Sequence, residues 1–390
     1  MYDHVKSIFW IFSIVLLWSF AYSGKKLSQT QHDKSYWKYA ALPILVFTSF
    51  YGLRFGRLID YNLYEVRYQA LGNHLDDEYE LLFRYLCHWG ASFGIHYQYL
   101  IILISFLVIL SAFCLFKDTL YRKAMPYILG VFLFVVVPIE QLVRWYLAAA
   151  FYVFAIYFFL KSNYIKSSIF AACSCLIHIG FIPLVAFFII IYFIHVQLIP
   201  GKICMLLLLF SIFFGNTQML EGLSPYLSIL SMDDKSSKYV DNFSTLVTEG
   251  SRFIGIREFG FTTQIRMFLA YSFPLVFSKS LKNIGVKTWV INTYCIAIIA
   301  NPIFSKIEIL DRYCAILLLI SVPITTGMTF YMFIKNYSQY KMQIRWWGIL
   351  SIIANIYPTF SYLFGRKEWW YMLFIWDANG RETLPLYYFN

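Results

Sequence analysis

Arginine, carboxylate and phenol side chains recur near the ends of apolar stretches, and together such groups can hold a phosphate beside a sugar. One segment contains Arg54, Arg57, Asp60, Tyr61 and Tyr64 at steps of three and four residues. If this segment is helical, all five share one face. Two guanidinium groups, a carboxylate and two phenols on one stripe suit a sugar phosphate. The alternative is a simple Arg57–Asp60 ion pair on an interfacial helix.

Two further charged positions stand at the ends of apolar stretches. Glu80 comes four residues before Arg84, a spacing at which the two could simply pair on a helix. Glu140 and Gln141 precede Arg144, which is followed by sixteen uncharged residues and so lies at or just below a membrane surface. A charge at that depth is costly unless it is partnered or functional. Arg144 is therefore a candidate anion-binding residue, and Glu140 is its alternative, structural partner.

His178 lies among apolar residues, far along the chain from any loop charge. Gly180 and Pro183 shortly after it predict a break in the helix, and broken helices in membranes usually line a polar cavity. A neutral imidazole can also accept a proton near neutral pH. We therefore interpret His178 as a functional residue and a candidate general base. The alternative is a core histidine with satisfied hydrogen bonds.

Two later connections place arginines beside aromatic residues. The longest polar connection, 217–264, contains Arg252 and Arg257 together with six tyrosines and phenylalanines. Such a loop could cover a cavity and stack on sugar rings, or it could form an interfacial aromatic belt. A later connection supplies Arg312 and Tyr313 at the start of an apolar stretch.

The elements that must position these residues are membrane helices. Sixty per cent of the 390 residues are apolar, only 14% are charged, and the mean hydropathy is +0.61. A soluble chain cannot hide so much apolar surface, so the composition predicts a polytopic membrane protein, and its long apolar stretches predict the all-α class. It excludes a cytosolic enzyme, a disulfide scaffold and a disordered hub. About twelve stretches, several of them short, are candidate transmembrane helices of a single membrane domain over 1–390: 5–23, 39–53, 95–116, 125–137, 141–160, 167–179, 181–195, 203–216, 264–278, 288–303, 313–334 and 346–364.

The charges of the connections predict the orientation. With the N-terminus outside, the inside connections hold 16 basic residues and two acids, and the outside holds 16 basic residues and 19 acids. This is a positive-inside distribution, so the net charge of +11 reflects topology and does not indicate nucleic acid. The loop 217–264 and the aromatic tail 365–390, an expected interfacial anchor, both lie outside. The seven cysteines form no CxxC pair or zinc-like cluster and are interpreted as packing residues.

The two faces also differ in the kind of basic residue. Inside, 14 of the 16 basic residues are lysine, whereas 11 of the 16 outside are arginine. The planar fork of arginine suits bidentate binding of phosphate. An anion site on the outer face is therefore predicted, although any single arginine could instead pair with one of the outside acids.

The order of these motifs resembles the EpsG family of exopolysaccharide proteins, within the broader group of Wzy-type O-antigen and capsule polymerases. The resemblance is strongest over 51–193. The residues that carry it are Arg54, Asp60, Tyr64, Glu80, Val143, Arg144, Leu147, Ala148, His178, Gly180, Pro183, Arg312 and Tyr313.

The resemblance implies a glycosyltransferase of the bacterial inner membrane. Such enzymes join lipid-linked oligosaccharide repeat units at the periplasmic face, with undecaprenyl pyrophosphate as the carrier. The implied partners are the donor and acceptor lipids, the bilayer, and the chain-length regulator and flippase of the same pathway.

The residues fit this chemistry independently, because a pyrophosphate leaving group needs its developing charge neutralised. The sequence has no Asp-x-Asp triplet of the kind that often holds a metal in enzymes using nucleotide sugars, and preplaced arginines can serve without a metal or other cofactor. We expect His178 or Asp60 to act as base, with Glu80 as a further candidate. The expected binding residues for pyrophosphate and glycan are Arg54, Arg57, Arg144, Arg312, Arg252, Arg257, Tyr61, Tyr64, Glu140, Gln141 and Tyr313.

Two other classes of protein stay open. A flippase for the same lipid-linked sugars would use arginines to bind headgroups, but its charges should follow a path open to both faces. A different membrane transferase, either a ligase that moves the finished polymer or an O-acetyltransferase, is the second alternative. The ligase reaction is chemically almost identical to polymerisation.

Overall fold

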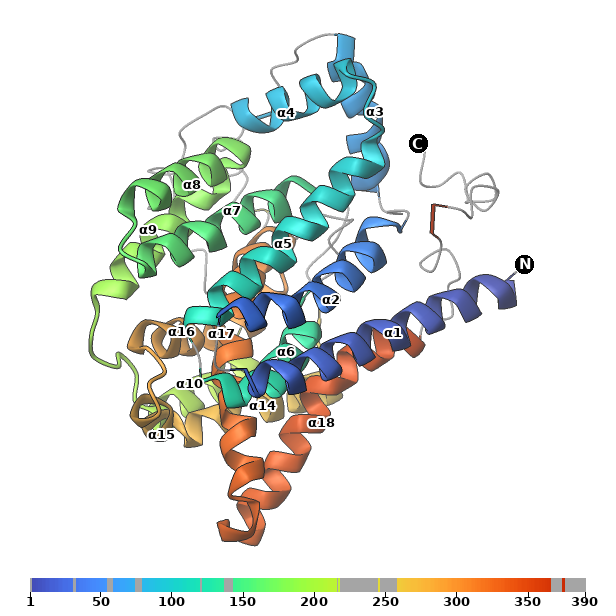
Figure 1. The fold of residues 1–390 in the computed structure, drawn as a ribbon. Coiled ribbons are helices and arrows are strands. Elements are labelled where there is room, and N and C mark those ends of the chain that lie inside the picture. Colours follow the sequence, from blue (N-terminus) through green and yellow to red (C-terminus); the bar gives the residue numbers. More distant parts are fainter. Residues whose placement is uncertain are drawn as a thin grey trace. The chain divides into compact units, whose positions relative to one another are not determined.

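The computed structural model of the protein is helical (Figure 1). It describes residues 2–30, 33–54, 59–73, 79–119, 121–136, 143–215, 217, 245, 258–365 and 374–375. Within these ranges the regular structure is helical, apart from one isolated antiparallel bridge between Arg54 and Phe374. The predicted all-α class is confirmed.

The chain divides into two compact units, Met1–Ile190 with Pro358–Asn390, and Ile191–Tyr357. The boundaries fall within α9 (Ile182–Phe193) and α18 (Met342–Phe364). The other helices of the first unit are α1 (Tyr2–Ser28), α2 (Asp33–Gly52), α3 (Ile59–Asn73), α4 (Leu81–Ser92), α5 (Tyr97–Thr119), η1 (Arg122–Ala124), α6 (Met125–Val135), α7 (Val143–Leu160), α8 (Tyr164–Ile177) and η3 (Ile179–Phe181). The second unit contains α10 (Gly201–Phe214), α14 (Phe261–Val276), α15 (Ser278–Asn283), α16 (Thr288–Phe304), α17 (Glu308–Lys335) and η6 (Tyr337–Gln339).

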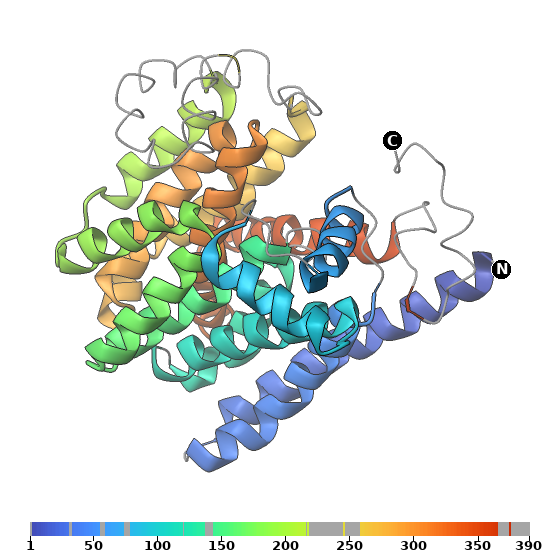
Figure 2. The ribbon, with the colours of Figure 1, turned by 90° about the horizontal axis from the view of Figure 1, so that it is seen from above.

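In the first unit α5 packs against both α2 and α7, and α7 packs closely against α8 (Figure 1, Figure 2). Small residues permit the close approach of α7 and α8, because Ala148 is fully buried and a larger side chain would separate the two backbones. Two serines of α8 then reach carbonyl groups of α7. The Ser174 hydroxyl donates to the carbonyl of Ala148 (2.8 Å), and the Ser167 hydroxyl donates to that of Ala155 (2.9 Å).

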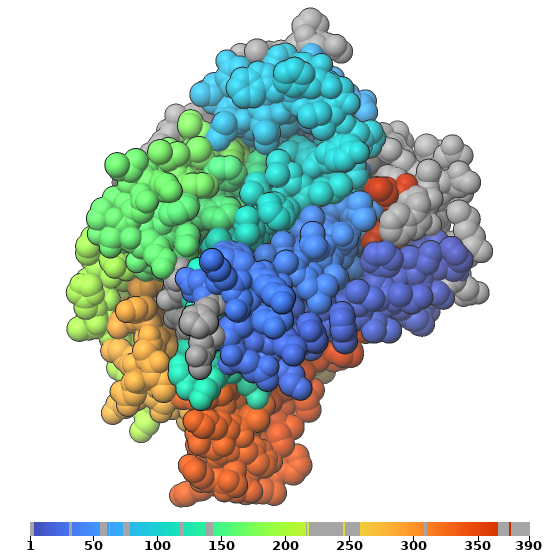
Figure 3. Space-filling model, viewed as in Figure 1, coloured from blue at the N-terminus to red at the C-terminus, as the bar shows by residue number. Residues whose placement is uncertain are grey.

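The short helix α4 packs against α3 and α8 and exposes a row of apolar side chains. Leu81, Tyr85 and Trp89 recur at steps of four residues and are exposed, whereas Phe83 and Cys87 are buried. The atoms of α4 lie on the surface, at the top of Figure 3. A 12-residue helix covers only about 18 Å, too short to cross a hydrocarbon layer of about 30 Å. An apolar row on so short a helix is typical of a helix lying in the plane of the membrane interface.

Helix lengths bear on the number of membrane spans. By length and composition, five described helices can cross a membrane: His4–Ser28, Tyr97–Lys117, Val143–Leu160, Leu310–Lys335 and Met342–Phe364. Four other apolar helices are shorter, with 10–17 residues: Tyr164–Ile177, Ile179–Phe193, Gly201–Phe214 and Thr288–Phe304. The protein is therefore helical with several candidate membrane spans, and the count of about twelve stays a prediction. The two numbers differ because hydropathy reports the length of an apolar stretch and not the residue at which a helix ends.

The predicted helix break after His178 is confirmed. α8 ends at Ile177, and His178 has extended backbone angles (φ −152°, ψ 112°). One turn of 3-10 helix, η3, follows before α9 begins at Ile182, next to Pro183. The proline ring blocks a continuous helix from α8 into α9. The break directs the His178 side chain and the Ile179 amide away from a regular helical ladder.

In the second unit α17 packs against α16 and α14, and α10 packs against α14 and α16. Hydroxyl groups along buried α17 donate to carbonyl groups four residues earlier, as from Ser321 to Leu317 and from Thr325 to Ser321. The Asn292 side chain holds the connection between α9 and α10. Its Oδ1 accepts from the Leu198 N–H (3.0 Å), and its Nδ2 donates to the Val196 carbonyl (2.9 Å).

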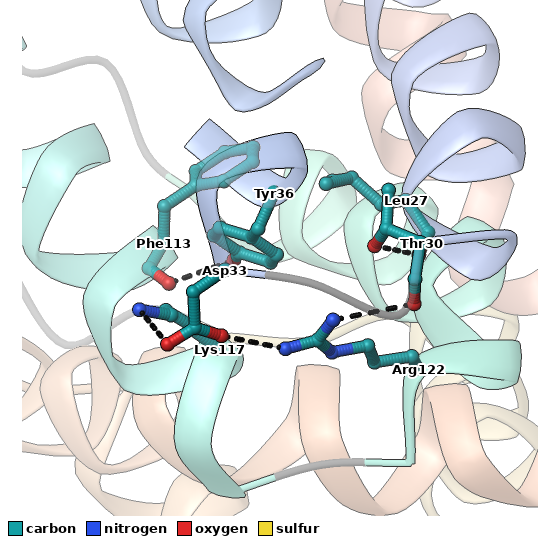
Figure 4. A network of polar contacts seen from close by, with 7 residues as sticks. All are labelled: Leu27, Thr30, Asp33, Tyr36, Phe113, Lys117 and Arg122. Atoms are coloured by element: carbon teal, nitrogen blue, oxygen red, sulfur yellow. Dashed lines mark hydrogen bonds and ion pairs between the residues drawn. The ribbon is translucent and has the colours of Figure 1, made fainter. Parts of the chain in front are cut away.

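A polar network in the first unit joins the turn after α1 to α2, α5 and η1 (Figure 4). The Asp33 carboxylate lies 3.0 Å from Lys117 Nζ and accepts a 2.8 Å hydrogen bond from Arg122 Nη2. The Nη1 of Arg122 also donates to the Thr30 carbonyl (3.2 Å). The turn after α1 is thereby tied to η1, and the start of α2 is tied to both α5 and η1.

We expect Asp33→Asn to lower the unfolding temperature at neutral pH, and to do so less in high salt, because an exposed ion pair is screened. The hydrogen bond from Lys117, with the charge of Arg122, lowers the pKa of Asp33 below its ordinary value of about 3.9. A lowered carboxyl pKa gives stability that is present above the ordinary pKa and is lost as the pH falls through the lowered value. Thermal unfolding in detergent should therefore show a gap between wild type and variant that closes in acid. A gap of constant size at all pH values would contradict this role of the carboxylate.

Candidate functional site

Glu80 and Arg144 form an ion pair in the first unit. Glu80 is the residue immediately before α4, and Arg144 is the second residue of α7. The Arg144 Nη1 donates a short hydrogen bond to Glu80 Oε2. The carboxylate therefore pairs with an arginine 64 positions along the chain, although the spacing to Arg84 had suggested a local helix pair. The alternative partner of Arg144, Glu140, lies outside the described residues.

The broken turn after α8 brings His178 to the same carboxylate. The Ile179 N–H donates to Glu80 Oε1 (3.3 Å), and His178 Nδ1 lies 4.0 Å from that oxygen. The Gly180 N–H donates to His178 Nδ1 (3.1 Å). The ring of Trp145 stands edge-on to the imidazole, with centroids 4.9 Å apart and planes at 88°. One carboxylate thus links the start of α7 to the break between α8 and α9.

Tyr79 forms an aromatic wall beside this pair. The guanidinium carbon of Arg144 lies 5.2 Å from the centre of the Tyr79 ring, and that of Arg67 lies 5.5 Å from it. Arg67 Nη1 also donates to the phenol oxygen, at 3.5 Å, and the Tyr64 ring stacks 5.6 Å away. Burial raises the pKa of Tyr79 to about 12, so its hydroxyl stays neutral and can donate a hydrogen bond.

We call these five residues, Arg67, Tyr79, Glu80, Arg144 and His178, the Glu80 cluster. The Arg144, Glu80 and His178 side chains are 16–18% exposed, so they are mostly shielded but not sealed from solvent. Within the cluster Arg144 pairs with Glu80, and Arg67 lies against the Tyr79 ring. The Arg144 Nε is buried and finds no hydrogen-bond acceptor among the described residues. The cluster can therefore accept an anion, because a positive group in a partly desolvated place favours a negative ligand.

Arg54 occupies a different part of the first unit. It is 1% exposed, its Nη1 donates to the Tyr362 hydroxyl (2.8 Å), and its guanidinium carbon lies 5.3–5.7 Å from the ring centres of Phe9, Phe50 and Tyr362. Arg54 is not part of a helix that continues to Tyr64, because its backbone bridges to Phe374 and α3 begins only at Ile59. The conditional expectation of one helical stripe is therefore wrong at Arg54. Its binding of substrate stays a prediction.

The remaining predicted residues are distributed as follows. Tyr61 on α3 is buried and donates to Gln98 Oε1 (2.7 Å), whereas Tyr64 reaches the Glu80 cluster through Tyr79. Asp60 lies in α3, but its side chain is outside the described part of the chain. Arg312 and Tyr313 are in the first turns of α17, in the second unit. Five predicted residues lie outside the described ranges: Arg57, Glu140, Gln141, Arg252 and Arg257. Most of the loop 217–264 and of the tail 365–390 also lies outside them.

Sequence reasoning missed Arg67, Tyr79 and Trp145. Arg67 follows Tyr64 by three residues, a helical spacing that places both on one side of α3. Trp145 was visible only as the neighbour of Arg144, and Tyr79 as the neighbour of Glu80. Adjacency to a predicted site residue was the available signal, and aromatic residues are too frequent in this chain for it to stand out.

A comparison with known protein families identifies a match over most of the chain. No curated protein and no solved structure matched the chain. A family model described as the EpsG family matches residues 37–370, a stretch that includes Glu80, Arg144 and His178. Because this match covers most of the chain and agrees with the order of motifs in the sequence, the protein belongs to the EpsG family.

Proposed function

We propose that the protein is a polysaccharide polymerase, a glycosyltransferase that joins undecaprenyl-pyrophosphate-linked repeat units at the periplasmic face of the bacterial inner membrane. Membership of the EpsG family supports a role in making polysaccharide within a membrane. The apolar helices support a multi-pass protein. The periplasmic side is inferred from the positive-inside distribution of the loop charges.

The observation that carries the proposal is Arg144, held by Glu80 beside His178 in a partly buried cluster. In the proposed reaction a hydroxyl oxygen of the acceptor sugar forms a bond to the anomeric carbon of the donor glycan. The bond from that carbon to the pyrophosphate oxygen breaks, and its electron pair stays on the phosphate. Arg144 offsets the charge that develops there, and the fixed ion pair with Glu80 orients the guanidinium in advance.

The hydroxyl proton needs a base, for which we propose Asp60 or His178. Arg57 and Arg312 are each proposed to bind phosphate, whereas Arg54, at 1% exposed, is proposed to be a packing residue. The outer-loop residues Arg252 and Arg257 are proposed to contact the glycan, together with the phenol groups of Tyr64 and Tyr79. No metal enters this scheme, because the arginines themselves neutralise the leaving group.

The test is chain growth by the purified protein in liposomes, supplied with a lipid-pyrophosphate-linked repeat unit. The wild type should convert it to a ladder of longer glycans, and Arg144→Ala and His178→Ala should each abolish the ladder. Lys25→Ala, an exposed basic position near the end of α1, is the control and should leave the ladder intact. Movement of the lipid across the bilayer without chain growth would overturn the polymerase proposal in favour of a flippase.

Gly180→Ala probes the geometry of the histidine. A Cβ at Gly180 would lie 3.1 Å from both Cε1 and Nδ1 of His178, and 3.1 Å from the Trp145 ring. The imidazole must then move by a few tenths of an ångström, and we expect the rate of chain growth to fall about 10-fold. The rate is measured from the ladder, and thermal unfolding should change little.

Gly130→Ala in α6 is the matched control, because no described atom lies within 4 Å of the added Cβ. It should retain wild-type activity and gain up to about 1 kcal/mol from better helix propensity. Equal activity of the two alanine variants would show that the position of the imidazole has no effect on the rate.

A further inference from the structure

One side of α4 is held firmly by α3. The His88 Nδ1–H donates to the Leu71 carbonyl (2.6 Å), because a carbonyl oxygen can only accept. The Tyr68 hydroxyl donates to the Ile95 carbonyl just after α4 (2.8 Å), and a Cβ added at Gly90 would lie 2.5 Å from that hydroxyl. The two helices are therefore in close contact, and α4 cannot roll about its axis. The side chains that α4 exposes must stay exposed.

The exposed side of α4 is apolar and uncharged. Leu81, Tyr85 and Trp89 are exposed at steps of four residues, and the only other exposed residue of the helix is Ser92. The rings of Tyr85 and Trp89 contact each other, with centroids 5.9 Å apart, and exposed Phe93 at the C-cap continues the row. Tyrosine and tryptophan rings prefer the boundary between lipid headgroups and acyl chains. The row therefore has the composition of a surface that meets lipid.

α4 also stands at the end of a candidate membrane span. α5 begins four residues after Phe93, and its segment Tyr97–Lys117 is long and apolar enough to cross a membrane. Tyr99, Leu103 and Phe106 are exposed at steps of four and three residues, so they share one side of α5. Exposed apolar side chains on a spanning helix face lipid tails. Because the chain enters the bilayer directly after α4, this helix lies at a membrane face.

We propose that the α4 row, defined as Leu81, Tyr85, Trp89 and Phe93, docks into the phospholipid leaflet at this end of α5. The partner is bilayer lipid and not a second copy of the chain. Since none of the exposed side chains of α4 carries a charge, the docking comes from burial of apolar surface and does not require anionic headgroups.

Docking of α4 also sets the depth of the Glu80 cluster. Glu80 immediately precedes α4, and its carboxylate accepts from Arg144 and from the Ile179 amide. A helix fixed in the interface therefore holds the guanidinium of Arg144 near the headgroup layer. The charged part of a lipid-linked pyrophosphate lies in that layer, because burying it among the acyl chains would be costly. This consequence rests on the proposed function, whereas the docking itself does not.

Photo-crosslinking identifies what covers the α4 row. The photoreactive residue p-benzoylphenylalanine, placed at Trp89 or at Tyr85, bonds to a neighbouring C–H group on irradiation. The purified full-length protein is studied in vesicles of phosphatidylcholine, with and without phosphatidylglycerol. We expect an adduct with the added mass of one phospholipid at both positions and in both kinds of vesicle. The same residue at Gln29, an exposed polar position in the turn after α1, is the control and should give about 10-fold less lipid adduct.

The other products would overturn the proposal. A covalent dimer would show that a second copy covers the row, and a cross-link within the chain would show that another segment covers it. The absence of any adduct would show that the row faces water. A lipid adduct that forms only with phosphatidylglycerol would overturn docking through apolar surface alone.

Trp89→Ser tests the effect of docking on the Glu80 cluster. We expect the apparent KM for the lipid-linked repeat unit to rise about 10-fold while kcat stays within about 2-fold, because the site is displaced from its substrate and its own groups are unchanged. Trp18→Ser on α1 is the matched control, since Trp18 is 56% exposed and Trp89 is 60% exposed. Equal KM values for the two variants would overturn the link between α4 and the cluster. A wild-type protein that makes no ladder would overturn the proposed function alone, because the lipid adduct does not depend on chain growth.

Discussion

Arg144→Ala should lower the rate of glycan chain growth by about 100- to 1,000-fold, the loss expected when one preplaced donor to a developing charge is removed. The guanidinium is the charged group of the Glu80 cluster best suited to a diphosphate, because it is fixed by Glu80 and keeps its Nε without an acceptor among the described residues. The loss should fall mainly on kcat if the contact tightens as the bond breaks, and on KM if it only binds the ground state. Rates of ladder growth at several substrate concentrations separate the two.

Arg144→Lys refines this prediction. Lysine keeps the positive charge but lacks the planar fork that can hold Glu80 and a phosphate oxygen together. We expect its rate to lie between those of wild type and the alanine variant. Full activity of Arg144→Ala would remove the basis of the proposed mechanism.

A loss of folding must be distinguished from a loss of chemistry. Arg144→Ala leaves the mostly buried Glu80 carboxylate without its guanidinium partner, which should cost about 2–3 kcal/mol, at or below the range for breaking a buried pair. Glu80→Gln combined with Arg144→Ala removes the unpaired charge and should recover part of that stability. Because the double variant still lacks the guanidinium, it should stay inactive. Thermal unfolding and ladder growth of the single and double variants together show which effect operates.

Arg54→Ala should instead reduce stability, by about 2–4 kcal/mol, because it leaves a cavity in a packed region and removes a buried hydrogen bond. The side chain is 1% exposed, between the rings of Phe9, Phe50 and Tyr362. Its contacts join α2 to the end of α18 within the first unit. The unfolding temperature in detergent is the measurement.

Tyr362→Phe is the matched control for Arg54. It removes the hydroxyl that accepts from Arg54 but keeps the aromatic ring, so it should cost only about 1 kcal/mol. If Arg54→Ala left stability unchanged but abolished chain growth, Arg54 would act on substrate, as the sequence suggested, and its packing role would be refuted.

Several features followed from the sequence because they depend on local properties. Composition predicted a membrane protein, since no soluble packing can cover 60% apolar residues, and the long apolar stretches predicted its helices. Gly180 and Pro183 predicted the break beside His178, because proline prevents helix continuation in any context. The order of short motifs indicated the EpsG family, and the family match agrees. Glu80, Arg144 and His178 were each identified as candidates for one site, but the contacts between them were not predicted.

Tertiary structure decided which of those candidates meet. Arg144 had an obvious local partner in Glu140, yet it pairs with Glu80, because α4 and the break after α8 bring that carboxylate to the start of α7. Arg54 had the helical spacing of a stripe, yet its backbone pairs with Phe374, more than 300 residues later. Spacing along a chain reports only what lies within a turn or two of helix. Contacts between distant segments depend on the packing of whole helices, and no local pattern specifies that packing.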